Sequence, residues 1–164
     1  MKYPYLFTLA GHDYYLRPLV AGDLDQVLVV ERELYAGMLP WSRWVFLNEI
    51  NHQSQRLYWG LFTPDDQLIG YIGCWLKFRE SHITNLAIAK DWQGRGLGRF
   101  LMKKMIVVAQ AHQCQIVTLE ARTDNLPALN LYHQLGFIDQ KVRVNYYDYD
   151  HSDAVSMCLS LNKK

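Results

Sequence analysis

A chain of 164 residues, half of them hydrophobic, is about one domain long and can fill a core without metal or disulfides. Its 17 Lys and Arg against 16 Asp and Glu exclude a general electrostatic attraction to nucleic acid or to an anionic membrane. Cys74, Cys114 and Cys158 are widely spaced, and the histidines show no HxxxH or HExxH spacing, which argues against disulfides and metal sites. With no membrane-length apolar run, we expect a soluble cytoplasmic protein, with residues 1–164 forming a single domain.

The N-terminal third of the chain predicts a hairpin followed by two helices. Residues 5–19 contain two extended segments around an Ala-Gly-His-Asp turn. Residues 22–37 have the apolar spacing of a helix that ends at Gly37. A second helix is expected in residues 39–53, where Ser42 is the expected N-cap.

The middle of the chain predicts three strands and then a strand–helix–strand unit. Residues 56–78 and 81–89 are rich in β-branched and aromatic side chains, and Pro64-Asp65-Asp66 marks a turn within the first segment. One side of a helix is predicted to carry Leu97, Leu101, Met105, Val108 and His112. The next segment, "QIVTLEA", should then lie parallel to "ITNLAIA".

The C-terminal part predicts a short helix and a closing antiparallel pair of strands. The helix lies in residues 125–137, where Asn125 can cap it and Gly136 suits its end. The strands lie in residues 137–150 and 152–161. The fold class is therefore α/β, with a mixed sheet.

Three glycines stand directly before the central helix, at Gly94, Gly96 and Gly98. A strand that leads through glycines into a helix leaves free N–H groups at the helix N-terminus, which is an arrangement that binds anions. A P-loop is excluded because Lys and then Ser or Thr do not follow Gly98. A dinucleotide-binding fingerprint remains a weaker alternative, because Arg99 stands where its third glycine belongs. Glu120 does stand where that fingerprint has the acidic residue that binds the ribose. A glycine turn without a ligand is the other alternative.

The segment "QGRGLG", residues 93–98, resembles the Q/R-x-x-G-x-G/A pyrophosphate loop of the GCN5-related N-acetyltransferases, the GNAT superfamily. Four segments are similar, in order, to the branch of this superfamily that acetylates protein N-termini: "LPWS", "ITNLAIAKDWQGRGLGRFLM", "LEARTDNLPALNLYHQLGF" and "VRVNYYDYDHSDAVSMCL". The resemblance covers nearly the whole chain and implies the GNAT fold, a mostly antiparallel sheet with a central parallel pair and flanking helices. Residues 1–12 look like an extension before the usual family start.

The resemblance implies acetyl-CoA as co-substrate and no metal. The pyrophosphate would rest on the backbone amides of residues 94–99, and one amide of the preceding strand would polarise the thioester carbonyl. Asn125 matches a family residue that contacts the pantetheine arm, although its role as a helix cap explains it equally well. The residues expected to bind acetyl-CoA are Leu86, Ala87, Ile88, Gln93, Gly94, Arg95, Gly96, Leu97, Gly98, Arg99 and Asn125.

Acetyl transfer requires that the attacking amine lose a proton and that the departing thiolate gain one. The resemblance matches Tyr132, in "NLYHQLGF", to the family's general acid, and Glu120 to its proposed base, which would act directly or through water. The alternatives are an ordinary buried tyrosine and a solvated carboxylate at a strand end.

The resemblance also implies the acceptor. Arg143, Tyr146 and Tyr147 match the strand pair that closes over an incoming peptide, and Trp41 would border the peptide groove besides packing against the first helices. The expected reaction is acetylation of a protein N-terminal α-amine, that of the alanine of ribosomal protein S18, with neither nucleic acid nor membrane as partner. The alternatives are acetylation of a small amine or a lysine side chain, and a non-catalytic acyl-CoA-binding module.

Overall fold

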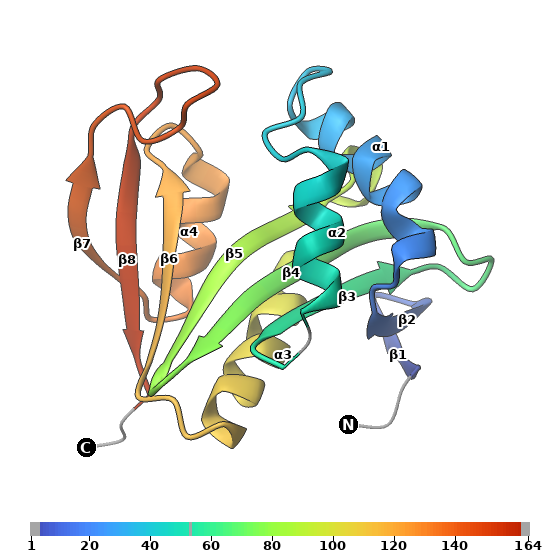
Figure 1. Ribbon diagram of the computed structural model, residues 1–164. Helices are drawn as coiled ribbons and strands as arrows, with labels where there is room; N and C mark the ends of the chain where they lie inside the picture. The colour runs from blue at the N-terminus through green and yellow to red at the C-terminus, as the bar shows by residue number, and fades with distance from the viewer. Residues whose placement is uncertain (1–3, 53, 162–164) are drawn as a thin grey trace. The chain divides into compact units, whose positions relative to one another are not determined.

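The computed structural model describes residues 4–52 and 54–161. Within these residues the strands are β1 (Tyr5–Leu9), β2 (His12–Pro18), β3 (Arg56–Phe62), β4 (Leu68–Lys77), β5 (Glu80–Ile88), β6 (Ile116–Arg122), β7 (Ile138–Arg143) and β8 (Ala154–Ser160). The α-helices are α1 (Leu24–Leu34), α2 (Arg43–Asn51), α3 (Leu97–Ala111) and α4 (Leu126–Gln134). The strand order β1-β2-β3-β4-β5-β6-β8-β7, with β5 and β6 parallel, confirms the predicted mixed sheet (Figure 1).

The chain divides into two compact units. The first unit comprises residues 1–75 and 85–104, and the second comprises residues 76–84 and 105–164. Both β5 and α3 therefore pass from one unit to the other. The single domain expected from the sequence stays a prediction.

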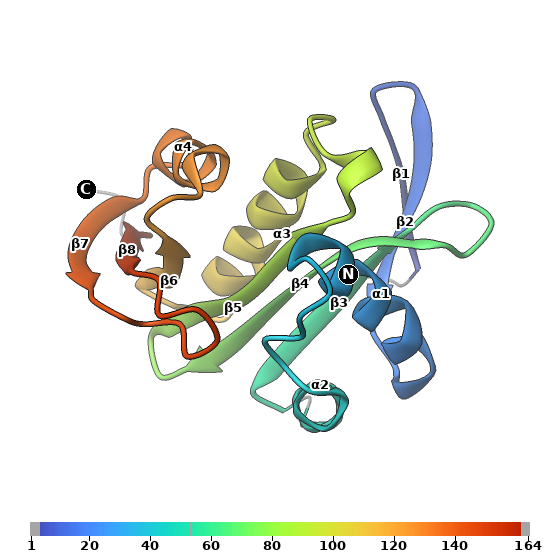
Figure 2. The same cartoon turned by 90° about the horizontal axis from the view of Figure 1, so that it is seen from above.

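In the first unit, helices cover both faces of the central strands. The two views agree that α1 and α2 lie on one face of β3 and β4, whereas the first two turns of α3 lie on the other (Figures 1 and 2). Helix α1 buries Leu24, Val27 and Leu28, as the spacing of its apolar residues predicts. Helix α2 begins where expected, because the Ser42 side chain accepts a hydrogen bond from Val45 N at 3.4 Å.

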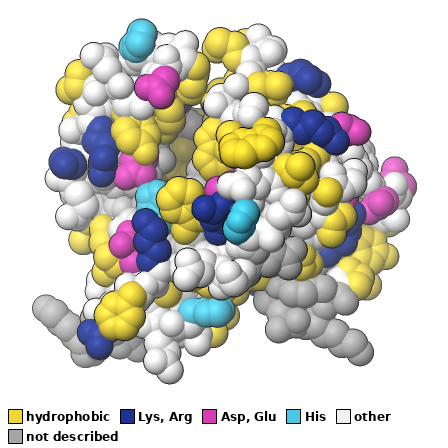
Figure 3. Space-filling model, in the orientation of Figure 1, with side chains coloured by type: hydrophobic (Ala, Val, Ile, Leu, Met, Phe, Trp, Pro, Cys, Tyr) yellow, Lys and Arg dark blue, Asp and Glu magenta, His cyan; other side chains and the backbone are white. Residues whose placement is uncertain are grey.

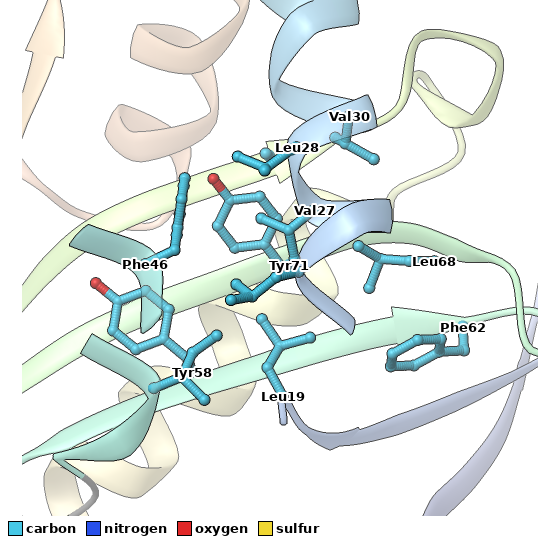
Figure 4. Close-up of a cluster of buried hydrophobic side chains, with 12 residues drawn as sticks. Leu19, Val27, Leu28, Val30, Phe46, Tyr58, Phe62, Leu68 and Tyr71 are labelled. Carbon is cyan, nitrogen blue, oxygen red and sulfur yellow. The ribbon is translucent and has the colours of Figure 1, made fainter. Parts of the chain in front are cut away.

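The core between these helices and the strands is built from large side chains. Phe46 on α2 meets Tyr71 on β4 edge to face, with 5.9 Å between the ring centroids, and Val27 on α1 lies in the same cluster (Figure 4). Burying one such side chain contributes about 1.5–3 kcal/mol. The cluster is therefore the main apolar attachment of both helices to the strands.

One buried carboxylate also connects α2 to the strands. Glu49 on α2 is 5% exposed. Its oxygens accept hydrogen bonds from Arg56 Nη1 at 2.8 Å and from Trp75 Nε1 at 2.5 Å, and the Tyr58 hydroxyl lies 3.2 Å from one of them. The same hydroxyl lies 3.2 Å from Asn85 Oδ1 on β5. Glu49 thereby joins one helix to two strands, and through Tyr58 to a third.

The N-terminal extension forms strand β1, which pairs antiparallel with β2. Residues 1–3 lie outside the described residues. Phe7 on β1 stacks on Phe100 in the first turn of α3, with 3.9 Å between the ring centroids. The Lys104 ammonium lies 4.0 Å from the centroid of the Tyr5 ring. The extension therefore packs against the N-terminal half of α3.

In the second unit, α4 packs beside β6 and β8 (Figure 2). Asn125 Oδ1 accepts a hydrogen bond from Ala128 N at 3.3 Å, and Gly136 ends the helix at φ +93°, so both predicted helix ends are confirmed. The predicted pairing of the last two strands is also confirmed, but β8 lies between β6 and β7. His112, predicted on the same side of the central helix as Leu97 and Leu101, is exposed and lies beyond the end of α3.

Cys74, Cys114 and Cys158 carry thiols and form no disulfide. Cys74 and Cys114 are buried, and Cys158 is half-buried. No helix among the described residues is both long and apolar enough to span a membrane.

We predict that Gly73→Ala lowers the free energy of unfolding by about 1–3 kcal/mol, the usual cost of overpacking. A Cβ atom at Gly73 would lie 2.2 Å from Tyr58 Cε1, and this ring cannot move freely because its hydroxyl is held between Glu49 and Asn85. Urea denaturation measures the change. Gly22→Ala is the control, since nothing lies within 4 Å of its Cβ position, and it should change the free energy by less than about 0.5 kcal/mol. An equal effect of both substitutions would contradict the steric explanation.

Candidate active site

The glycine-rich loop lies in the first unit, between β5 and α3. Gly94 and Gly96 have φ values of +75° and +80°, a conformation that residues with a side chain rarely adopt. Residues 93–96 are exposed, and α3 begins at Leu97. The first N–H groups of a helix have no acceptor within the helix, so those of α3 are available to an anion beside the loop.

Two side chains of the loop turn back onto the protein. Gln93 Nε2 donates to Ile88 O at 2.9 Å, which ties the loop to the end of β5. Arg95 Nη2 donates to Asp91 O at 3.0 Å, and its guanidinium lies 4.6 Å from the centroid of the Trp92 ring. In this structure both side chains therefore brace the loop, and the backbone remains as the surface for a ligand.

The strand segment Leu86–Ile88 lies very close to β4. A Cβ atom at Gly70 on β4 would lie 2.7 Å from Ala87 O and 2.6 Å from Ile88 Cδ1. Ala89 N donates to Ile69 O at 2.9 Å just after the strand. Gly70 therefore permits an approach between β4 and the end of β5 that a larger residue would prevent.

Glu120 lies near the end of β6, in the second unit. Its two oxygens have partners on three other elements. Ser156 Oγ on β8 donates to Oε1 at 3.3 Å, and Arg143 Nη2 on β7 lies 3.6 Å from the same oxygen. His82 Nε2 on β5 lies 3.2 Å from Oε2. The hydrogen bond with His82 is the largest influence that lowers the pKa of Glu120, so the carboxylate is ionised at neutral pH.

Tyr132 is buried in α4, and its ring packs against Phe137 with 5.9 Å between the centroids. Burial raises the pKa of Tyr132 to about 12. The phenol therefore keeps its proton at neutral pH, which a proton donor requires. Asn125, at the start of the same helix, is exposed and uses its side-chain oxygen as the helix cap.

Tyr146 and Tyr147 do not lie on a strand, contrary to the prediction, because β7 ends at Arg143. The two rings pack edge to face, 5.1 Å apart, in the loop between β7 and β8. Burial, followed by the charge of Glu120, raises the pKa of Tyr146. Charged side chains of both signs gather over β7 and β8 (Figure 3).

Two residues of this region escaped the sequence analysis. Arg122 at the end of β6 donates to Tyr149 Oη at 3.0 Å and to Asp150 Oδ2 at 2.5 Å, and so anchors the tyrosine-containing loop. His82 contacts Glu120 from β5. Side chains alternate between the two faces along the predicted parallel strands, and this alternation was the available signal. It places His82 and Glu120 on the same face only when the register of the strands is known, and the sequence does not give the register.

The candidate residues fall into two groups by unit. Leu86, Ala87, Ile88 and the loop from Gln93 to Arg99 belong to the first unit, together with Trp41, whose ring lies 5.4 Å from that of Phe46. Glu120, Tyr132, Asn125, Arg143, Tyr146 and Tyr147 belong to the second unit. Over residues 4–52 and 54–161, no group of three or more His, Cys, Asp or Glu side chains is arranged to hold a metal ion.

Known proteins similar to this chain are N-acetyltransferases. The sequence model of the acetyltransferase (GNAT) family matches residues 27–137. The ribosomal protein bS18-alanine N-acetyltransferase of Salmonella typhimurium is 31% identical over 142 residues, which are 85% of this chain and 93% of that protein. The crystal structure of the ribosomal-protein-S18-alanine N-acetyltransferase from Escherichia coli has a TM-score of 0.80 at 27% identity and covers 92% of this chain and 96% of its own.

A more distant structure shares the fold of this chain. The PaiA N-acetyltransferase from Thermoplasma acidophilum was solved in complex with coenzyme A. It has a TM-score of 0.75 at 22% identity and covers 90% of this chain and 98% of its own. At this identity the similarity concerns the fold.

We predict that Gly96→Asp weakens acetyl-CoA binding by on the order of 100-fold or more, because it places a negative charge at an anion site. Calorimetry on the folded variant measures the affinity. Gly37→Asp is the matched control: Gly37 has φ +89° and open space around its Cβ position, so it carries the same backbone strain away from the loop. Unchanged affinity in the Gly96 variant would contradict pyrophosphate binding by this loop.

Proposed function

This chain belongs to the acetyltransferase (GNAT) family, and on that basis we propose that it transfers an acetyl group from acetyl-CoA to the α-amine of a protein N-terminus. The acceptor we propose is the N-terminal alanine of ribosomal protein S18, because relatives covering most of the chain carry this activity in their names. The observation that carries the proposal is the hydrogen-bonded carboxylate of Glu120, which a protein that merely binds acyl-CoA does not need.

In the proposed reaction the glycine-rich loop binds acetyl-CoA through its backbone. The amides of residues 94–99 take the pyrophosphate, and the backbone of Leu86–Ile88 pairs with the pantetheine, as in the family. The hydrogen bond from Gln93 and the close packing of Gly70 against Ala87 support this assignment, because both hold the loop and the strand in one position. Asn125 contacts the pantetheine arm with the part of its amide that does not cap α4.

Glu120 takes the proton of the amine, through a water molecule. An ionised carboxylate with a lowered pKa is a weak base, so it suits an amine that loses its proton easily. An α-amine with a pKa near 8 is about one-fifth neutral at pH 7.4, whereas a lysine side chain with a pKa near 10.4 is about one-thousandth neutral. This difference favours an N-terminal acceptor over lysine.

Tyr132 donates its phenolic proton to the sulfur atom of coenzyme A, which is the leaving group. Its pKa of about 12 is well above that of an ordinary thiol, about 8.5, so full transfer to a relaxed thiolate would be uphill by several kcal/mol. Donation is therefore effective while negative charge develops on the sulfur in the transition state. Arg143, Tyr146, Tyr147 and Trp41 would hold the acceptor peptide.

We predict that Tyr132→Phe lowers kcat on the order of 100-fold and leaves acetyl-CoA affinity within a few-fold, because the ring still packs and only the donor is lost. Steady-state kinetics and calorimetry separate the two effects. Tyr14→Phe is the control: Tyr14 is also buried, and its hydroxyl has no hydrogen-bond partner among the described residues, so its loss should leave kcat unchanged. A Tyr132 variant as fast as the wild type would remove this residue from the mechanism.

The acceptor is tested with two peptides of one sequence. We predict that a short peptide with the free N-terminal alanine of S18 is acetylated, and that an N-terminally blocked copy carrying an internal lysine is acetylated at least tenfold more slowly, as the difference in free amine requires. Mass spectrometry reads both products. Preference for the blocked lysine peptide would overturn the N-terminal acceptor while leaving the family assignment intact.

A further inference from the structure

Four polar side chains of the second unit form a continuous hydrogen-bonded chain on one face of β5 and β6. Glu120 Oε2 lies 3.2 Å from His82 Nε2, and His82 Nδ1 lies 2.8 Å from Thr118 Oγ1. Thr118 Oγ1 in turn donates to Glu80 Oε1 at 2.6 Å. The parallel register pairs His82 with Thr118, so the alternation of each strand brings Glu80 and Glu120 to the same face.

The positions of the hydrogens follow from what each group can donate. The Thr118 hydroxyl has one hydrogen and gives it to Glu80, so it must accept from His82 Nδ1, which therefore carries a hydrogen. A neutral imidazole has only that one N–H, and its Nε2 would then present a lone pair to the ionised carboxylate of Glu120. At 3.2 Å this contact is favourable only when a proton lies between the two atoms.

We propose that His82 is a positioning residue that shares one proton with Glu120 and thereby sets the pH at which Glu120 can accept the proton of the acceptor amine. The inference rests on the proposed function, because it concerns the base of that reaction. Thr118 and Glu80 hold the Nδ1 hydrogen in place and take no proton themselves.

The proton balance is complete without a further reactant. The pair first releases its shared proton to solvent, which leaves an ionised Glu120 and a neutral His82. The N–H bond of the acceptor ammonium then breaks, its electron pair stays on nitrogen as the nucleophile, and the proton passes through water to the carboxylate of the pair. Imidazole suits this role because it gains and loses protons near neutral pH.

Charged and polar groups lie on both sides of the pair. Arg143 lies 3.6 Å from Glu120 and favours the ionised carboxylate, and Ser156 donates to the same oxygen. Tyr146 interacts with Glu120 from the loop after β7. On the other side of the imidazole, Glu80 accepts the hydrogen of Thr118, so its carboxylate lies next to the hydroxyl that accepts from His82 Nδ1.

The decisive variant is His82→Gln, because the glutamine amide can still donate to Glu120 but cannot exchange a proton. We measure kcat as a function of pH at saturating peptide and acetyl-CoA. In the variant, we expect the pH below which kcat falls to lie at least one unit lower than in the wild type, closer to the pKa of a carboxylate alone. We expect the maximal kcat, reached above that pH, to fall on the order of tenfold, because a carboxylate alone is a weaker base than the His82–Glu120 pair. The KM for acetyl-CoA should not change. A profile identical to the wild type would show that His82 is only structural.

Two further variants test the role of the chain. Thr118→Val removes the acceptor for the His82 Nδ1–H group and the link to Glu80, so the protonated pair loses a stabilising partner. The pH below which kcat falls should therefore be lower, and the maximal kcat should stay within about threefold of the wild type. His133→Gln is the matched control, since His133 Nε2 lies 2.8 Å from Asp139 in an exposed histidine–carboxylate pair of the same unit. An unshifted Thr118 variant, or an equally shifted His133 variant, would overturn the proposal.

Nitrogen NMR of His82 gives a readout that does not depend on activity. The neutral imidazole should carry its hydrogen on Nδ1, and Glu120→Gln should move the titration midpoint of His82 about one unit lower, because a carboxylate that favours the charged form is gone. A neutral tautomer with hydrogen on Nε2, or a midpoint indifferent to Glu120, would refute the shared proton. If the wild type acetylates no peptide, the proposed function fails, while this titration still decides whether the pair shares a proton.

Discussion

The arrangement of the first unit depends on satisfying the buried carboxylate of Glu49. An ionised group this far from water costs several kcal/mol unless donors surround it. Arg56 and Trp75 supply those donors from two neighbouring strands, so α2 has to dock where its glutamate reaches both. Tyr58 extends the same network to Asn85, directly before the strand segment proposed to hold acetyl-CoA. The carboxylate that fixes the position of α2 therefore also restrains the strand next to the proposed cofactor site.

Glu120 has the opposite character, and the contrast separates a structural carboxylate from a chemical one. Glu49 is held by an arginine and an indole, which keep their protons throughout the accessible pH range. Glu120 is held by a hydroxyl, by Arg143 at the longer distance of 3.6 Å and by His82, and a histidine exchanges its proton near neutral pH. Its side chain also retains 13% of its exposure, so water can reach it. Replacing His82 with a side chain that always donates would give Glu120 the kind of partners that Glu49 has.

The sequence predicts those features that depend on neighbouring residues. The caps at Ser42 and Asn125 were found because a cap lies within three residues of the amide it binds. The glycine-rich loop was found because positive φ angles at Gly94 and Gly96 demand glycine locally. The insertion of β8 between β6 and β7, and the contact of His82 with Glu120 across 38 positions, depend on strand order and register, which no local pattern specifies.

The N-terminal strand shows how packing far from any chemistry supports a site made of backbone. Amides that bind pyrophosphate must stay in position, and the first turn of a helix is where helices fray most readily. Phe7 stacks on Phe100 in that turn, and Leu9 comes within 4.0 Å of the Cβ position of Gly96. Holding the turn in the free protein reduces the conformational entropy that cofactor binding would otherwise have to remove. Strand β1 therefore supports the proposed cofactor site by keeping its backbone in place, and no group of this strand takes part in the proposed chemistry.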